Sequence, residues 1–380
     1  MNVLKDYMVD NTEEIIDLLQ RLVEFESPSS DKHANDMLGE FIAKLLSDIG
    51  LEVAFDKQSA MGNHIIAKWP LVEDSGDPIL LLCHMDTVWP IDTIHERPFS
   101  RGERALKGPG VFDMKGGLAC TLFALIAMKR LNLVPLHPLT LIINSDEELG
   151  SPTSRKLIDD EARKSQYCLV MEAGMGPQGK IKTSRKGVGS FEIQVQGSAA
   201  HASLVPDKGI NAIEEMMFLL LNVLDSADIS KGTTVNIGMI EGGIARNVVA
   251  PHAKAVIDVR VSSLSEANRI TDAILNLQPR NPEALISISG GITRQPMELS
   301  EKGEILFSVV KDLALNELEL DLEQGSTGGG SDGQIASAAG CPTLDGMGVI
   351  GYGAHSVNEA TLIRSLPIRS ALIATVLMKV

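Results

Sequence analysis

Hydrophobic residues near the start of the chain recur with the period of an α-helix. Asn11 is followed three residues later by Glu14, which predicts a capping box at the start of one amphipathic helix. A second helix is expected to end before Gly50, because glycine favours the left-handed conformation found just after helices. The apolar positions that define the two helices are Ile15, Leu18, Leu19, Leu22 and Phe25, and then Leu38, Phe41, Ile42, Leu45 and Leu46.

Short continuous apolar runs appear further along the chain. Runs of this kind predict strands that are buried on both faces of a sheet. Helical stretches at Met114–Arg130 and Arg369–Lys379 alternate with them or follow them, which is typical of an α/β fold with a mostly parallel sheet. The expected strands are Ile79–Cys83, Leu139–Ile143, Cys168–Met171 and Pro342–Leu344.

Between residues 186 and 293 the pattern changes to alternating apolar and polar positions, as at Phe191, Ile193 and Val195. The elements expected there follow the order β-α-β-β-α-β, which is typical of a small ferredoxin-like α+β sandwich. We interpret residues 186–293 as an inserted domain, so that residues 1–185 and 294–380 form two segments of one larger domain.

Composition excludes several classes of protein. A chain of 380 residues is long enough for two domains, and a formal net charge of -16 argues against nucleic-acid binding. The longest apolar stretch, Thr121–Met128, is too short to span a bilayer, and the N-terminus lacks the pattern of a signal peptide. We therefore expect a cytoplasmic protein that makes no membrane contact.

Side chains that can bind metal ions follow the predicted strands or precede the long helix. In an open parallel sheet, ligands bind beyond the carboxyl ends of the strands. Side chains from several distant segments are therefore expected to meet at one edge of the sheet. They are His84 and Asp86 after the first strand, Asp146, Glu147 and Glu148 after the second, Glu172 after the third, His355 in a glycine-rich loop after the last, and Asp113 before the helix.

Five of these residues also have an ordinary structural interpretation, and Glu172 and His355 are uninformative when taken singly. His84 and Asp86 could form a hydrogen-bonded pair, Asp113 could cap the helix that follows it, and Glu147 and Glu148 could lie in a solvated loop. Taken together, however, two imidazoles and three carboxylates suit two Zn²⁺ ions that share one aspartate. Asp86 could then fix the second nitrogen of the imidazole. Glu147 would point away from Glu148 along an extended backbone and could act as a general base.

These segments resemble the glutamate carboxypeptidase and aminoacylase family of di-zinc metallopeptidases. The matching segments are 82–88 (LCHMDTV), 108–117 (GPGVFDMKGG), 144–150 (NSDEELG), 171–172, His201, 242–247 (GGIARN), 326–332 (STGGGSD) and His355. They occur in family order and span nearly the whole chain. The resemblance implies a zinc-exopeptidase-like catalytic domain, with the inserted domain acting as a lid and dimerisation domain.

The resemblance also implies roles for individual residues. The metal ligands that it implies are His84, Asp113, Glu148, Glu172 and His355, with Asp113 shared by both ions. The catalytic residues that it implies are Glu147 as general base, Asp86 as the residue that orients His84, and His201, which reaches the active site of the other subunit in a homodimer. The substrate-binding residues that it implies are Asn247, Arg260 and Arg294, although Arg260 could instead form a salt bridge with Asp258.

The implied activity is amide hydrolysis that removes a C-terminal, glutamate-like residue from a small peptide. A metal-bridging hydroxide would attack the scissile carbonyl, and two Zn²⁺ ions per subunit are the expected cofactors, with cobalt or manganese as substitutes. An alternative is an N-acyl-amino-acid deacylase of the acetylornithine or succinyl-diaminopimelate type. A third hypothesis is a metal-binding homologue that has lost catalysis.

Overall fold

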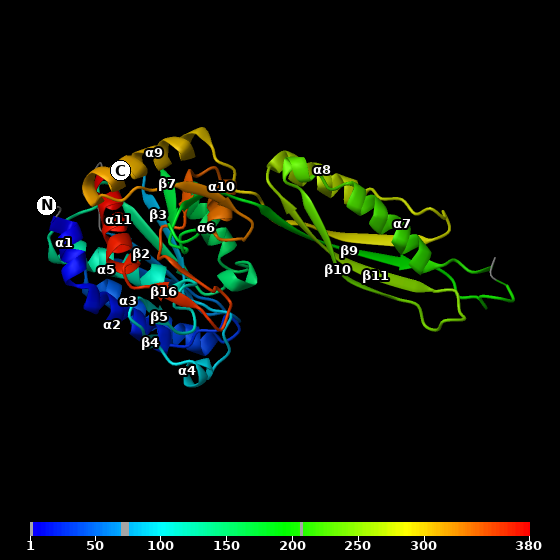
Figure 1. Ribbon diagram of the computed structural model, residues 1–380, viewed down its shortest axis with the longest axis horizontal. Coiled ribbons are helices and arrows are strands. Elements are labelled where there is room, and N and C mark those ends of the chain that lie inside the picture. The colour runs from blue at the N-terminus through cyan, green and yellow to red at the C-terminus, as the bar shows by residue number, and fades with distance from the viewer. Residues whose placement is uncertain (1–2, 70–75, 206–207) are drawn as a thin grey trace. The chain divides into compact units, whose positions relative to one another are not determined.

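The computed structural model describes residues 3–69, 76–205 and 208–380 (Figure 1). The chain forms two compact units, each with its own sheet and hydrophobic core. The first consists of Met1–Ser184, Leu299–Thr327 and Ser331–Val380, and the second of Arg185–Glu298 with Gly328–Gly330. None of the helices in the described ranges is long and apolar enough to cross a membrane.

The first unit contains most of the helices and a central sheet. Its elements before the second unit are α1 (Val3–Asp10), α2 (Thr12–Glu24), α3 (Lys32–Asp48), β1 (Glu52–Asp56), β2 (His64–Trp69), β3 (Ile79–His84), α4 (Thr93–Glu96), β4 (Ser100–Arg101), β5 (Ala105–Lys107), α5 (Lys115–Arg130), β6 (Leu139–Asn144), the 3₁₀ helix η1 (Glu147–Leu149), α6 (Arg155–Ala162), β7 (Tyr167–Val170) and β8 (Ile181–Arg185). Those after it are α9 (Glu301–Leu318), β13 (Gln324–Thr327), α10 (Gly333–Ala338), β14 (Thr343–Asp345), β15 (Gly351–Tyr352), β16 (Ala360–Leu362) and α11 (Ser365–Lys379).

The central sheet has eight strands in the order β1-β2-β6-β3-β7-β14-β8-β13. The four strands in its middle, β6, β3, β7 and β14, pair in parallel. Towards the edges the pairing is antiparallel, as between β1 and β2 and between β8 and β14. The expected α/β class with a parallel centre is therefore confirmed. A second, four-stranded sheet with the order β15-β16-β5-β4 was not predicted, because its strands are only two or three residues long.

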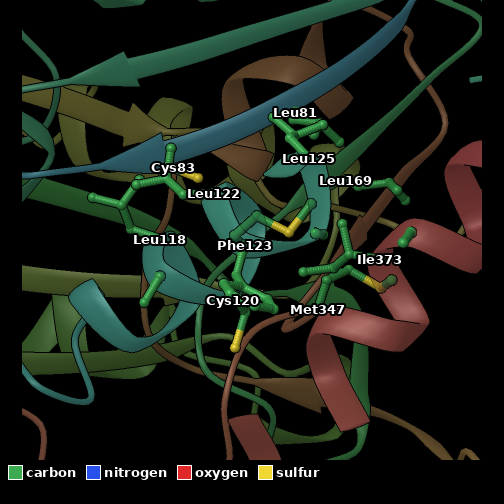
Figure 2. Packing of buried hydrophobic residues seen from close by; sticks show 14 of the residues in the cluster. Leu81, Cys83, Leu118, Cys120, Leu122, Phe123, Leu125, Leu169, Met347 and Ile373 are labelled. Atoms are coloured by element: carbon green, nitrogen blue, oxygen red, sulfur yellow. The ribbon is translucent and has the colours of Figure 1, made fainter. Parts of the chain in front are cut away.

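The apolar runs of the central strands pack against helices on both faces of the sheet. On β3, Leu81 and Cys83 belong to the large core that includes α5 and α11 (Figure 2). Leu80 and Leu82, which alternate with them, belong to a smaller cluster with α6 and α10. Because neighbouring side chains of a strand point to opposite faces, a strand covered on both sides needs apolar residues at every position. This explains the continuous run that predicted β3.

The N-terminal helices follow the predicted pattern except at their start. A short helix, α1, precedes α2, and the side-chain amide of Asn11 donates a hydrogen bond to the carbonyl of Tyr7 at 2.7 Å. Asn11 makes no side-chain cap for α2, so the predicted capping box is wrong. The preceding helix supplies a carbonyl acceptor that sequence spacing does not reveal. Gly50 follows α3 with a positive φ of 90°, as expected for a residue that ends a helix.

The second unit is a four-stranded antiparallel sheet with two helices on one face. Its strands run in the order β10-β11-β9-β12, and Phe191, Ile193 and Val195 of β9 point into the core beneath the helices. This confirms the predicted β-α-β-β-α-β order. The role of the unit as a lid and dimerisation domain stays a prediction. Its elements are β9 (Gly187–Gln196), α7 (Ala212–Asp225), the 3₁₀ helix η3 (Ile229–Lys231), β10 (Thr234–Gly242), β11 (His252–Val261), α8 (Leu264–Leu275) and β12 (Leu285–Arg294).

Candidate active site

His84, the last residue of β3, lies at the carboxyl edge of the central sheet and is almost completely buried. Its Nδ1 atom lies 3.0 Å from the carbonyl oxygen of Asp86 and 3.4 Å from the Asp86 carboxylate. A neutral imidazole whose Nδ1 atom donates a hydrogen bond keeps a lone pair on Nε2. Among the described residues, this buried Nε2 atom has no hydrogen-bond partner, although Asp113 and Glu172 face it.

Asp113 and Glu172 come from segments that are held together by close backbone packing. Asp113 precedes α5, and Glu172 follows β7. Gly117, in the first turn of α5, contacts the backbone of Met171, and a Cβ atom at this position would lie 1.9 Å from the Met171 carbonyl oxygen. A larger residue would push the helix away from the strand end. This contact explains why glycine occupies position 117 between the two candidate ligands.

Glu147 and Glu148 lie in the 3₁₀ turn η1, and the predicted extended backbone is therefore wrong. The buried carboxylate of Asp86 accepts hydrogen bonds from their main-chain N–H groups at 3.3 and 3.2 Å. The hydroxyl of Ser29 donates a further hydrogen bond to Asp86 at 2.6 Å. In a 3₁₀ helix, as in a strand, successive side chains point in different directions. The side chains of Glu147 and Glu148 therefore still diverge. Asp86 thus holds both His84 and the turn in place. The contact of Ser29 with Asp86 was not predicted from the sequence.

His355 lies in the loop between β15 and β16 and adopts a left-handed backbone conformation, with φ of 58°. Its side chain is half-exposed, whereas that of Glu148 is mostly buried. The Nε2 atom of His355 lies 3.2 Å from a carboxylate oxygen of Asp113 and 3.0 Å from one of Glu148. A loop from the C-terminal part of the chain therefore meets the two acidic residues delivered by earlier segments.

The structure brings the five predicted ligands together as two groups that share one carboxylate. Potential ligand atoms of the first group, His84, Asp113 and Glu172, lie within 4.8 Å of one another, and so do those of the second group, Asp113, Glu148 and His355. Two donors bound to one tetrahedral Zn²⁺ ion are roughly 3.4 Å apart. The Nε2 atom of His84 lies 3.5 and 3.4 Å from oxygens of Asp113 and Glu172. Donor types and spacing both fit a site for two cations.

The imidazoles and carboxylates also shift each other's pKa values. Burial opposes a charge on His84, but pairing with Asp113, Asp86 and Glu172 raises its pKa well above the usual range. Hydrogen bonding to Asp113 raises the pKa of His355. Burial acts against ionisation of Asp113, yet the two histidines hold its pKa below the usual range. Burial raises the pKa of Glu148. A cation held here would need neutral imidazoles, so cation binding and protonation of the two histidines compete.

Comparison with known proteins gives the family. The sequence profile of Peptidase family M20/M25/M40 matches residues 80–379. The chain belongs to this peptidase family. The resemblance found in the sequence is thus confirmed, and the protein is a metal-dependent peptidase of the hydrolase class.

Three proteins similar to this M20 peptidase match it over more than nine tenths of their own length. Carboxypeptidase G2 from Pseudomonas sp. (strain RS-16) is 30% identical over 390 residues, which cover 99% of this chain and 92% of that protein. The crystal structure of aminopeptidase PepT from Bacillus cereus has a TM-score of 0.82 at 22% identity, covering 97% of this chain and 98% of the other. An M20 family metallo-carboxypeptidase, Sso-CP2 from Sulfolobus solfataricus, has a TM-score of 0.72 at 16% identity, covering 96% and 99%. The two structures share the fold of this M20 peptidase.

Two further candidate residues of this M20 peptidase, His201 and Asn247, lie on neighbouring segments of the second unit. The main-chain N–H of Ala202 donates a hydrogen bond to the carbonyl of Asn247 at 3.1 Å, and His201 forms a β-bridge with Val248. His201 is exposed, and its Nδ1 atom lies 3.2 Å from the hydroxyl of Ser203. This pairing continues the β9–β11 ladder beyond Gln196. Both residues therefore lie past the C-terminal end of β9.

The other two candidates, Arg260 and Arg294, lie at the opposite end of β9. Each is paired in register with Val188, Arg260 from β11 and Arg294 from β12. Arg260 forms an ion pair with Asp258 at 2.9 Å, which is the alternative partner considered from the sequence. Arg294 is buried. The substrate-binding roles of both arginines stay predictions.

Proposed function

We propose that this M20 peptidase is a two-zinc carboxypeptidase that removes a glutamate-like residue from the C-terminus of a small peptide or N-acyl amino acid. The observation that carries the proposal is the shared position of Asp113 between two groups of His and Glu ligands. The name and the near-complete alignment of carboxypeptidase G2 favour a carboxypeptidase over other amide hydrolases. The cytoplasmic location expected from the sequence stays a prediction.

The ligand set favours zinc as the cofactor. Imidazole and carboxylate are common zinc ligands, and cobalt or manganese could substitute because they accept the same donors. His84, Asp113 and Glu172 would hold one ion, and Asp113, Glu148 and His355 the other. When bound, the two cations would lower the pKa of water at the site and polarise the scissile carbonyl.

We assign the remaining roles to Asp86, Glu147 and the two arginines. Asp86 orients His84 through Nδ1 and holds the turn that carries Glu147. Glu147 acts as general base, takes a proton from the attacking water and passes it to the leaving amine. Arg260 and Arg294 would hold the free α-carboxylate of the substrate, since a guanidinium can bind a carboxylate with two parallel hydrogen bonds.

The geometry of the second unit supports a homodimer in which His201 acts in trans. On the strand β9, Val188 lies beside the two arginines, and His201 lies beyond Gln196. Val188 and Gln196 are eight residues apart on this strand. Eight residues of extended chain span roughly 27 Å. This is too far for His201 and Arg260 of one chain to contact the same small substrate. We propose that His201 of one subunit stabilises the reacting carbonyl in the active site of the other subunit.

The outer face of α7 offers a surface for this dimer. The face that points away from the core carries Met217, Leu221 and Leu224, which are 57%, 60% and 44% exposed. Their spacing places them in one stripe along the helix. The neighbouring edge strand β10 exposes Met239 and Ile240. An apolar stripe beside an edge strand is typical of a surface that pairs with another chain.

A panel of small substrates tests the proposed specificity. The metal-loaded protein is incubated with an N-acylated dipeptide that ends in glutamate, with its C-terminal amide, and with acetylornithine and succinyl-diaminopimelate. We expect release of glutamate from the free acid only, measured by mass spectrometry, because the amide lacks the carboxylate that the arginines bind. Cleavage of the acylated diamino acids alone would favour the deacylase, and metal binding with no hydrolysis would favour the inactive homologue.

Mixing two inactive variants tests the trans role of His201. One variant carries His201→Ala and the other Glu147→Gln, and the two are unfolded and refolded together. Half of the resulting dimers would be mixed and have one intact active site, so activity should recover to about a quarter of the wild-type value. Adding Leu221→Glu to both variants should prevent recovery by disrupting the dimer surface, as sedimentation would show. Recovery in a monomeric protein, or none in a stable dimer, would contradict the trans arrangement.

A further inference from the structure

Glu359 is a buried carboxylate that binds the backbone of the loop before α5. The residue is 1% exposed and lies immediately before β16. One of its oxygens accepts hydrogen bonds from the main-chain N–H groups of Phe112 and Asp113, at 2.9 and 3.1 Å. The other oxygen accepts from the N–H of Gly110 at 2.9 Å and from the indole N–H of Trp89 at 2.8 Å. Four donors thus converge on one side chain.

These contacts connect three segments that carry candidate ligands. Trp89 lies five residues after His84, Asp113 is the shared ligand itself, and Glu359 lies four residues after His355. Glu359, which lies in the same loop as His355, is therefore bound to the segment that follows His84 and to the main chain of the aspartate. Side chains that fix the geometry of metal ligands in this way govern how well the ligands fit the ion.

The carboxylate is suited to this task because it accepts hydrogen bonds and donates none when ionised. Burial of a carboxylate is costly unless donors satisfy both oxygens, and here main-chain and indole N–H groups do so. A glutamine of the same size would keep one acceptor oxygen but turn an NH₂ group towards two of the four donors. The loop from Gly110 to Asp113 would then have to move to avoid the donor–donor contact.

We propose that Glu359 is a positioning residue that sets the main chain of Asp113 and thereby the fit of the shared carboxylate to both cations. The inference rests on the proposed two-metal function. It assigns Glu359 a role in metal affinity through Asp113, with no direct contact to the ions or the substrate. Trp89, in the segment that follows His84, donates its indole N–H to the Glu359 carboxylate. Its ring also lies 3.9 Å from the guanidinium of Arg97.

Calorimetric titration of the chelator-treated protein with Zn²⁺ tests the proposal. Glu359→Gln should weaken binding of at least one of the two ions by about 10- to 100-fold. The matched control is Glu215→Gln, because Glu215 is also buried and accepts main-chain hydrogen bonds, from Arg280 and Asn281 of the second unit. Both variants should lower the melting temperature of the chelator-treated protein, but only Glu359→Gln should change zinc affinity.

A second variant keeps the test decisive if Glu359→Gln does not fold. Trp89→Phe removes one of the four donors and keeps an aromatic ring, and it should weaken zinc binding in the same direction by a smaller factor. Two ions bound by both variants with wild-type affinity would overturn the role of Glu359 and leave the proposed function intact. A wild-type protein that binds no Zn²⁺ would overturn both.

Discussion

Replacement of Glu147 by glutamine is expected to lower kcat by about 10²- to 10⁴-fold, which is the usual contribution of a general base. Glutamine has nearly the same size but cannot take a proton from water. The turn that carries the residue should stay in place, because Asp86 binds the main-chain N–H groups of Glu147 and Glu148 and not their side chains. The loss should therefore appear in kcat, with bound metal unchanged.

Steady-state hydrolysis of the glutamate-ending substrate, with metal content measured on the same samples, checks this expectation. Glu103→Gln serves as the control, because Glu103 is an exposed carboxylate of the same unit in the turn between β4 and β5. The control should keep wild-type kcat and two bound ions. Unchanged turnover in Glu147→Gln would show that another group acts as the base.

Replacement of Asp113 by asparagine is expected to abolish tight binding of both cations and, with it, measurable hydrolysis. Asp113 is the only described residue that belongs to both candidate ligand groups. An amide carries no charge and is a poor bridge between two divalent ions, so the remaining ligands lose their shared anion. By contrast, His355→Ala removes a ligand from one group only, and we expect it to retain the ion held by His84, Asp113 and Glu172.

Elemental analysis after dialysis distinguishes these outcomes. The wild-type protein should retain two ions per chain, His355→Ala one, and Asp113→Asn none. Circular dichroism on the same samples checks that the variants are folded. Two retained ions in folded Asp113→Asn would mean that the aspartate is not shared, and the arrangement proposed for the site would be wrong.

Much of the fold could be predicted because burial on both faces of a strand leaves a clear pattern. The runs that predicted β3, β6 and β7 are apolar at nearly every position, since helices cover both faces of the sheet. The edge strand β1 is mostly exposed and carries no such run. The residues at which helices begin were predicted less reliably than the helices themselves, which follow from hydrophobic periodicity. Helix α11 begins at Ser365 rather than Arg369, because Pro367 is tolerated in the first turn of a helix.

The candidate ligands could be predicted because strand ends and helix starts bring their side chains to one edge of the sheet. What the sequence did not reveal are the residues that hold the ligand-bearing segments in place without being ligands. Ser29 donates a hydrogen bond to the Asp86 carboxylate, and Glu359 accepts four from main-chain and indole N–H groups. Such contacts follow no spacing rule. The 3₁₀ turn at Glu147 also escaped prediction, because it depends on a distant carboxylate, that of Asp86.

Anomalous X-ray scattering at the zinc edge, from crystals of the zinc-loaded protein, tests the central claim most directly. The account predicts two peaks per chain, one bounded by His84, Asp113 and Glu172 and the other by Asp113, Glu148 and His355. No peak at these residues, or a single peak that does not contact Asp113, would contradict it.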